Sequence, residues 1–397
     1  MLRTSTSTLT RPVMRRSKNP ITRTALSASA SSPERRSSSP FMPSRHDRSA
    51  PPDGEVRARN ARRVAVARGT PAAAQDRVMT YAIDPELLPW LDMLPSFSLT
   101  DHGSLLAARA AMEASRDDLP AYEPVHPVEV RDTMAPGPSG APDVPVRLYS
   151  PANRTEAVPG LLYLHGGGFV LREFEMFHAA LLRLVDELGV VIVSVDYRLA
   201  PEHPFPAPVE DCYAALQWVG AKAQELGIDP ARLGVGGESA GGGLAAAVAL
   251  LARDRGGPSL CFQYLGIPEL DDRLDTPSMR VYTDTPWWNR PNAVFSWTSY
   301  LGTQPGGVDV SPYAAPARAE DLTGLPPAYV TTCQFDPLRD EGIEYARRLA
   351  HAGVATELRH YPGTFHGSGM VESAKISRRM LADELDALRR GLGVRGS

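Results

Sequence analysis

The chain has 397 residues, of which 43% are hydrophobic and 22% are charged, and its formal net charge at pH 7 is −4. This length and composition are ample for one large hydrophobic core and exclude a fibrous or wholly disordered chain. No apolar stretch approaches the roughly 20 residues that a helix needs to span a bilayer, so we expect no transmembrane segment.

The cysteine pattern indicates a reduced protein. Cys212, Cys261 and Cys333 are scattered in core-like segments, which is typical of packing residues and not of a disulfide framework. No group of His, Cys or acidic residues has the spacing of metal ligands, so we expect no metal and no cofactor. A cytoplasmic location fits this pattern best.

The first 78 residues differ in composition from the rest of the chain. They carry 16 Lys plus Arg against 5 Asp plus Glu, a net charge of +11, whereas the remainder carries 26 basic and 41 acidic residues. They are rich in Ser, Thr, Pro, Arg and Ala without a sustained apolar period. Such a segment cannot bury enough surface to offset the entropy of ordering it. We therefore expect a disordered basic tail over residues 1–78 and one folded domain over residues 79–397.

Other interpretations of this tail stay open. A secretory signal needs an apolar core of about 7–15 residues, and residues 24–30 are too polar to supply one. The pair Arg15-Arg16 lacks the apolar stretch of a twin-arginine export signal. An organelle transit peptide, a nucleic-acid-binding arm and a translation start placed ahead of a true start at Met79 remain. We favour a tail without a nucleic-acid partner.

The segments that follow predict helices and strands in alternation. Residues 87–114 contain helix-forming stretches, with an interruption around residues 95–103, and should contribute to a cap. Residues 144–149 alternate apolar and polar side chains, which predicts an early strand near a sheet edge. Residues 190–195 form a continuous β-branched run, typical of a strand covered on both faces.

A glycine-rich loop follows an apolar strand that lies between the two strands just described. Residues 161–164 run into His165, three glycines and Phe169. Glycines remove side chains from a loop, so its backbone N–H groups can turn toward an anion. In an acyl-transfer enzyme, the N–H groups of Gly167, Gly168 and Ala240 would form the oxyanion hole for a tetrahedral intermediate. The alternative is a flexible surface turn, which the strand context disfavours.

A serine lies at the apex of a strand–turn–helix pattern. Residues 237–241 read Gly-Glu-Ser-Ala-Gly, after an apolar run at residues 233–235 and before a helical stretch of small residues. This pattern predicts a nucleophile elbow with Ser239 at the carboxyl edge of a parallel sheet. Alone, the pattern Gly-x-Ser-x-Gly is weak, since it arises by chance in roughly one chain of this length in seven. The glycine loop upstream strengthens it.

A serine nucleophile needs a base, and the base needs an orienting acid further along the chain. Residues 327–333 predict a buried strand, with Asp336 at its end and Pro337 preventing its continuation. A second strand at residues 356–361 ends at a Pro-Gly pair, and His366 lies in the loop that follows. We therefore predict Asp336 as the acid and His366 as the base.

Two alternatives accompany this assignment. Asp336 could cap the helix that begins near Arg339, in which case Asp340 would be the fallback acid. Of the other downstream histidines, His351 lies in a helical stretch and His360 within a strand, so packing or surface roles suit them better.

A long excursion at residues 268–324 follows the strand at residues 261–267. It contains a cluster of aromatic residues: Trp287, Trp288, Phe295, Trp297 and Tyr300. An insertion at the carboxyl edge of the sheet should form a cap, together with residues from about 79 to 120. The aromatic side chains either fasten this cap to the core or line an acyl or alcohol pocket. Phe169, Trp287 and Trp288 are the candidate substrate contacts.

Together these motifs resemble the hormone-sensitive-lipase-like family of microbial esterases, an α/β-hydrolase group. The resemblance runs from about Asp84 to the C-terminus and rests on residues 165–169, 196–206, 237–242, 336–340 and 365–367. In that family the segment matching residues 196–206 is structural. One departure is Glu238, where family members commonly carry Asp or Thr. Glu at this place is typical of the longer type-B carboxylesterases.

The resemblance implies an α/β fold: an α/β-hydrolase with a mostly parallel central sheet flanked by helices and covered by a helical cap. It also implies a serine carboxylic-ester hydrolase that acts on small esters with short or medium acyl chains through an acyl-enzyme. An amidase or small-peptide hydrolase would use the same triad. A non-catalytic ligand-binding homologue would be signalled by a lost triad residue, and all three are present. A monomer and a homodimer both stay open.

Overall fold

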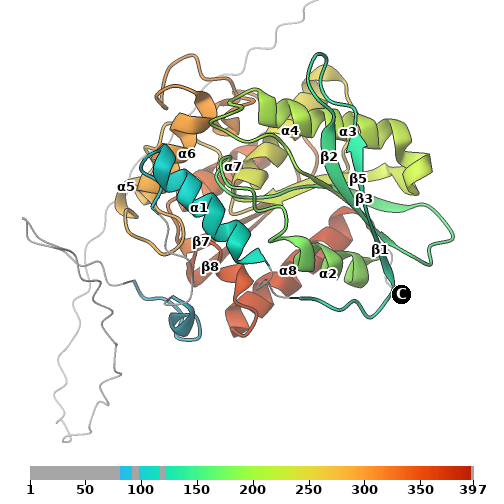
Figure 1. The fold of residues 1–397 in the computed structure, drawn as a ribbon, viewed down its shortest axis with the longest axis horizontal. Coiled ribbons are helices and arrows are strands. Elements are labelled where there is room, and N and C mark those ends of the chain that lie inside the picture. The colour runs from blue at the N-terminus through green and yellow to red at the C-terminus, as the bar shows by residue number, and fades with distance from the viewer. Residues whose placement is uncertain (1–80, 92–97, 117–120, 395–397) are drawn as a thin grey trace, which may run out of the picture. The chain divides into compact units, whose positions relative to one another are not determined.

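The computed structural model of the chain describes residues 81–91, 98–116 and 121–394. The tail expected at residues 1–78 lies outside the described residues. The described part is built around an eight-stranded sheet with helices on both of its faces (Figure 1).

The sheet is mostly parallel. Its strands are β1 (Val128–Ala135), β2 (Val144–Pro151), β3 (Val158–Leu164), β4 (Val191–Val195), β5 (Ile228–Glu238), β6 (Phe262–Gly266), β7 (Ala328–Phe335) and β8 (Thr356–Phe365). They lie side by side in the order β1-β2-β4-β3-β5-β6-β7-β8. The pairs β1/β2 and β2/β4 are antiparallel, and every pair from β4 to β8 is parallel. The fold class expected from the sequence is confirmed.

Helices alternate with the parallel strands. They are α1 (His102–Ala114), α2 (His178–Leu188), α3 (Ala207–Leu226), α4 (Ala240–Arg255), α5 (Pro277–Val281), α6 (Arg290–Leu301), α7 (Arg339–His351) and α8 (Lys375–Gly391). Short 3-10 turns lie at η1 (Leu88–Trp90), η3 (Pro316–Arg318) and η4 (Ser368–Met370). Because side chains alternate across a strand, Leu162 and Leu164 pack in the core with α3, α4 and α7. Leu161 and Tyr163 pack with α2 and α8 on the opposite face.

Helix α4 follows the central strand β5 and is buried along most of its length. Every residue from 240 to 252 is buried, and the helix is made largely of Gly, Ala, Val and Leu. Small side chains allow close approach: a Cβ added to Gly241 would lie 2.0 Å from the carbonyl oxygen of Leu164. The start of α4 is thereby pressed against the end of β3, where the glycine loop begins.

Strand β8 is longer than the sequence predicts. It continues through Pro362 and Gly363 to Phe365, whereas a break was expected after residue 361. An edge strand tolerates a proline because the missing N–H has no partner strand to serve. The register with β7 shifts between Cys333 and Phe335, which brings Phe335 opposite Phe365. Asp336 and His366 therefore both follow directly after paired residues.

Helix α1 is held to the domain mainly by polar contacts. It begins with a reciprocal capping box between Asp101 and Ser104 and buries only Leu105 and Ala108. Arg109 donates hydrogen bonds to the carbonyl oxygens of Val170 (2.8 Å) and Ala200 (2.9 Å). It also forms an ion pair with Glu202 at 2.6 Å. These contacts attach α1 both to Val170, just after the glycine loop, and to residues 200–202, which follow β4.

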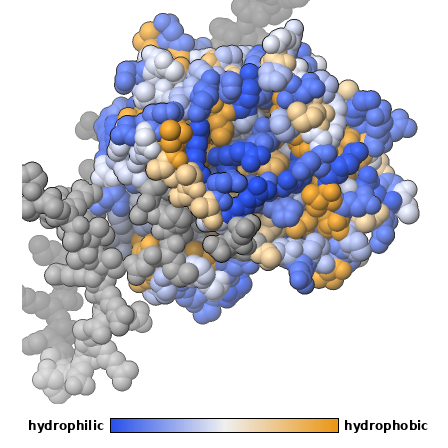
Figure 2. All heavy atoms as spheres, in the orientation of Figure 1, coloured by the Kyte–Doolittle hydropathy of each residue, from blue (hydrophilic) through white to orange (hydrophobic). Residues whose placement is uncertain are grey.

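No helix within the described ranges is both long and apolar enough to cross a membrane. On the face drawn in Figure 2, hydrophilic residues cover much of the described surface and hydrophobic residues lie in separate groups. The three cysteines form no disulfide with one another in the described part of the chain, and Cys212 and Cys333 are buried.

Candidate active site

Ser239 has the backbone conformation of a tight elbow. Its φ is 57° and its ψ is −123°, a region that non-glycine residues rarely adopt. Such strain costs about 1–3 kcal/mol and persists only where the surroundings enforce it. Here Ser239 N–H donates to the Gly266 carbonyl at 2.8 Å, and the Ser239 carbonyl accepts from the N–H groups of Gly243 and Glu269, each at 3.0 Å.

The predicted nucleophile, base and acid form one chain of hydrogen bonds. His366 Nε2 lies 2.9 Å from Ser239 Oγ, and His366 Nδ1 lies 2.7 Å from Asp336 Oδ2. Asp336 Oδ1 accepts the N–H of Leu338 at 2.9 Å. With the Nδ1 proton donated to Asp336, Nε2 is left as an acceptor for the serine hydroxyl. This geometry can activate a hydroxyl for attack on a carbonyl.

The charge of Asp336 affects the pKa of the His366 imidazole. Burial acts to lower the pKa of His366, but the charge of Asp336 and its hydrogen bond raise it, with smaller contributions from Glu173 and Glu238. The net pKa of His366 lies above its usual value. The ring is therefore a better proton acceptor than an isolated imidazole.

The alternative acid and bases lie elsewhere. Asp340 accepts the N–H of Ser278 at 2.7 Å and pairs with Arg339 at 2.7 Å. His360 Nδ1 lies 3.0 Å from the hydroxyl of Thr332, and His351 is exposed at the end of α7. Of the two aspartates and three histidines considered, Asp336 and His366 are the pair joined to Ser239 by hydrogen bonds.

The glycine loop turns sharply beside Ser239. Gly167 has φ +104° and Gly168 has φ +55°. A Cβ on Gly167 would lie 2.3 Å from the Leu171 carbonyl oxygen, and one on Gly168 would lie 2.3 Å from Trp288 Cη2. Ala240 is the first residue of α4, where N–H groups have no partner within a helix. Backbone donors of this kind beside a nucleophile can stabilise an oxyanion.

The three candidate substrate contacts differ in their surroundings. The ring centroid of Trp288 lies 6.1 Å from that of His366, so this side chain is beside the reacting groups. Trp287 lies near Gly367, the residue after His366, since a Cβ there would be 3.5 Å from Trp287 Cδ1. Phe169 is buried and stacks on Tyr300 with centroids 4.0 Å apart. For Phe169 this geometry favours packing between the loop and α6 over substrate contact.

Two residues that the sequence did not single out support the loop. Ser296 on α6 donates a hydrogen bond to the Gly168 carbonyl at 2.6 Å, and its Oγ lies 3.4 Å from Glu269 Oε1. Glu269 is fully buried, and burial raises the pKa of its carboxyl to about 8. A neutral carboxyl and a hydroxyl thus link the elbow, α6 and the glycine loop. The one signal in the sequence was an acidic residue two positions after the apolar strand expected at residues 261–267.

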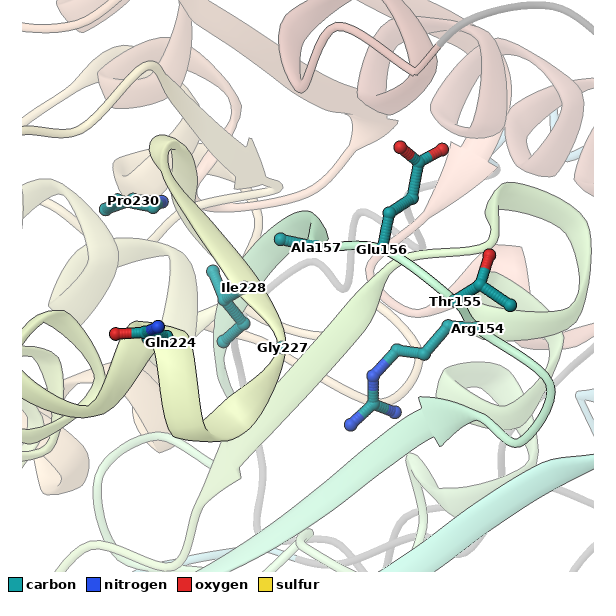
Figure 3. Close-up of a pocket in the computed structure, with 8 residues that line it drawn as sticks. All are labelled: Arg154, Thr155, Glu156, Ala157, Gln224, Gly227, Ile228 and Pro230. Atoms are coloured by element: carbon teal, nitrogen blue, oxygen red, sulfur yellow. The ribbon is translucent and has the colours of Figure 1, made fainter.

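A cavity of about 610 Å³ lies at the other end of β5 from Ser239 (Figure 3). It is lined by Arg154, Thr155, Glu156, Ala157, Gln224, Gly227, Ile228 and Pro230. Because Ile228 begins β5 and Ser239 follows its last residue, this cavity is at the edge of the sheet away from the triad. Within the described residues, no group of three or more His, Cys, Asp or Glu side chains is arranged to hold a metal ion.

A parallel sheet with a serine elbow, followed in chain order by an acid and a histidine at the same edge, defines the α/β-hydrolase class. The chain belongs to the alpha/beta hydrolase fold family, whose model matches residues 161–370. The resemblance to hormone-sensitive-lipase-like esterases is thereby confirmed.

Named relatives cover most of the described chain. "Carboxylesterase NlhH" of Mycobacterium tuberculosis (strain CDC 1551 / Oshkosh) is 40% identical over 294 residues, which span 72% of this chain and 88% of that protein. "Esterase LipI" of Mycobacterium tuberculosis (strain ATCC 25618 / H37Rv) is 40% identical over 304 residues, 74% of this chain and 91% of that protein. Among solved structures, "Bacterial Heroin Esterase" is 50% identical with a TM-score of 0.74, covering 79% of this chain and 99% of that one.

Proposed function

We propose that this chain is a serine carboxylic-ester hydrolase that acts on small esters with short or medium acyl chains through an acyl-enzyme. The observation that carries the proposal is the hydrogen-bonded chain Ser239–His366–Asp336 beside the glycine loop. Relatives that bear the names carboxylesterase and esterase at 40% identity support the ester as the substrate class.

The first half-reaction forms the acyl-enzyme. His366 Nε2 takes the Ser239 proton as Oγ attacks the ester carbonyl. Asp336 holds the imidazole in the required tautomer and stabilises its charged form. The N–H groups of Gly167, Gly168 and Ala240 stabilise the negative oxygen of the tetrahedral intermediate.

The second half-reaction releases the acid. Before it begins, His366 has given its proton to the alkoxide as the ester C–O bond breaks, which leaves Ser239 acylated. A water molecule then attacks the acyl-enzyme carbonyl with His366 again as base, and His366 protonates Ser239 Oγ as the carboxylic acid departs. Ser239 and His366 are 7% and 3% exposed. In so enclosed a site each electrostatic interaction is stronger than it would be in bulk water.

The experiment that tests the proposal is a hydrolysis profile over p-nitrophenyl esters of increasing acyl length, with one p-nitroanilide of matched acyl group. We expect the short and medium esters to be the best substrates and the anilide to be far slower. A faster anilide would make the chain an amidase. No turnover of any ester, together with ester binding, would make it a ligand-binding homologue.

The nucleophile is tested with the same substrates. Ser239→Ala should reduce ester turnover by roughly 10⁴–10⁶ without loss of fold. A serine-directed organophosphate should label the wild-type protein at Ser239. Retained turnover in a rigorously purified Ser239→Ala protein would remove Ser239 from the mechanism.

We further propose a small-molecule ester as the partner and the cytoplasm as the location. The three unpaired cysteines favour a reducing compartment.

A further inference from the structure

An acidic side chain faces the nucleophile across the first glycine of the loop. Glu173 is 7% exposed. A Cβ added to Gly166 would lie 2.6 Å from Glu173 Oε2 and 3.5 Å from Ser239 Cβ. A side chain at residue 166 would therefore occupy the space between the carboxyl group and the serine. The Glu173 carboxyl group and the Ser239 side chain therefore both lie close to Gly166.

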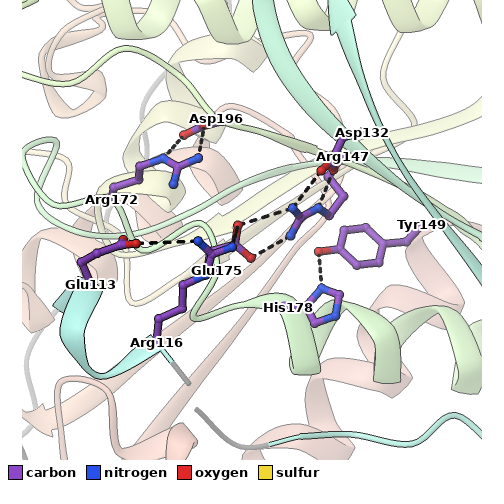
Figure 4. Close-up of polar contacts among 9 residues, drawn as sticks. All are labelled: Glu113, Arg116, Asp132, Arg147, Tyr149, Arg172, Glu175, His178 and Asp196. Atoms are coloured by element: carbon purple, nitrogen blue, oxygen red, sulfur yellow. Dashed lines mark hydrogen bonds and ion pairs between the residues drawn. The ribbon is translucent and has the colours of Figure 1, made fainter. Parts of the chain in front are cut away.

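The charged residues that flank Glu173 in the sequence, Arg172 and Glu175, are paired with other residues. Figure 4 shows Arg172 on Asp196, where Arg172 Nε donates to Asp196 Oδ1 at 2.9 Å. It also shows Glu175 between Arg147 and Arg116, at 2.8 Å and 3.0 Å. Within the described residues, neither a hydrogen bond nor an ion pair joins the Glu173 side chain to another group. These arginines therefore pair with other carboxylates and not with Glu173.

A nearby carboxyl differs from Glu173 in this respect. Glu238, directly before the nucleophile, accepts a hydrogen bond from the hydroxyl of Tyr264 at 3.0 Å. Glu173 has no such donor, although burying a carboxylate without a partner is costly. Burial raises the pKa of Glu173 to about 7, while His366 acts to lower it and Glu238 to raise it. Neutral His366, the form that can accept the serine proton, carries no positive charge, so the active resting site lacks a counter-charge beside Glu173.

We propose that Glu173 makes the site selective for esters that carry a cationic ammonium group a few bonds from the scissile carbonyl. The inference rests on the proposed ester hydrolysis and adds a substrate class to it. A bound ammonium group would supply the missing counter-charge, and charge-assisted contacts of this kind are the stronger ones in proteins. Trp288, whose ring lies 6.1 Å from that of His366, adds an aromatic face of the type that attracts ammonium groups.

The test compares two esters of the same shape on the full chain. Acetylcholine carries a quaternary nitrogen where 3,3-dimethylbutyl acetate carries a carbon, so the ratio of their kcat/KM values isolates the charge. We expect the wild-type protein to prefer acetylcholine by about tenfold or more at low ionic strength. Glu173→Gln should bring the ratio close to one. Any general effect of this substitution on Ser239 or His366 cancels in the ratio.

A matched control removes the same charge elsewhere. Glu156 is exposed at the opposite edge of the sheet, and Glu156→Gln should keep the wild-type ratio. A second readout is independent of turnover: calorimetric binding of both esters to the Ser239→Ala protein should favour the cationic ester by a similar factor.

The outcomes separate this inference from the proposed function. A wild-type ratio near one, or a preference that survives Glu173→Gln, overturns the role of Glu173 while hydrolysis of the neutral ester upholds the esterase. Loss of all ester turnover overturns the esterase. In that case the binding comparison still decides whether Glu173 selects a cation.

Discussion

His366 has one partner on each ring nitrogen, and the Asp336 bond decides which nitrogen carries the proton. Asp336→Asn should fold normally but turn over esters about 10⁴-fold more slowly, because an amide at this position can stabilise the wrong tautomer. Steady-state kinetics on a short p-nitrophenyl ester measures this effect. Asp340→Asn is the control, since Asp340 pairs with Ser278 and Arg339 and should cost less activity. If the two variants exchanged behaviours, the acid would be Asp340.

The same imidazole sets the pH dependence of kcat/KM. Only neutral His366 can accept the Ser239 proton, so activity should rise with pH through the titration of this ring. Asp336 raises the pKa of His366 above its usual value. The midpoint should therefore lie above about 6.5, with the plateau on the alkaline side.

Variants of the three downstream histidines test this assignment. His366→Ala should lose the pH dependence with nearly all activity, whereas His351→Ala and His360→Ala should keep both. A midpoint at or below 6.5 would mean that burial outweighs the charge of Asp336.

The residues of the candidate site were predictable to different degrees. Ser239 and Asp336 each follow a strand with a buried apolar run, and His366 follows the more polar strand β8. Parallel strands bring their carboxyl ends to one edge. Ser296 and Glu269 escaped notice because their importance depends on how α6 folds back over the loop. No local pattern encodes that contact.

Helix α6 is joined to the glycine loop by the hydrogen bond from Ser296 to the Gly168 carbonyl. Ser296→Ala would leave the buried Gly168 carbonyl without its hydroxyl donor, which costs about 1–3 kcal/mol. We expect kcat to fall by about tenfold with a smaller change in KM, because the loop donors would be less well placed for the transition state. Thr298→Ala on the same helix is the control, since its hydroxyl bonds the Val294 carbonyl within α6. Equal kinetics for the two variants would show that Ser296 only packs.

Some strands could be predicted from their apolar residues, and others could not. The buried runs that became β3, β4, β5 and β7 were evident from their apolar residues. Strand β1 was not anticipated, because most of its residues are exposed and it has no apolar face to reveal it. The extension of β8 through Pro362 depends on its edge position, which is a property of the assembled sheet.

At the scale of the whole molecule, the basic tail should be dispensable. Residues 1–78 carry a net charge of +11 in a composition without a core. Limited proteolysis should remove most of them and leave a stable fragment of at least about 300 residues. A shortened chain that begins at Met79 should keep its ester turnover and Tm. Unfolding of that shortened chain would show that the tail belongs to the folded domain.

Because α1 is attached mainly by polar contacts, the free energy of local unfolding should differ between the helices of the domain. Helix α4 is buried along most of its length, whereas α1 buries two side chains and relies on Arg109, whose ion pair with Glu202 is partly exposed. Solvent-exposed ion pairs are screened by salt. Amide hydrogens of α1 should therefore exchange with solvent well before those of α4, and faster still at high ionic strength. Such local unfolding would release the Val170 and Ala200 carbonyl groups from Arg109 while the sheet stays folded.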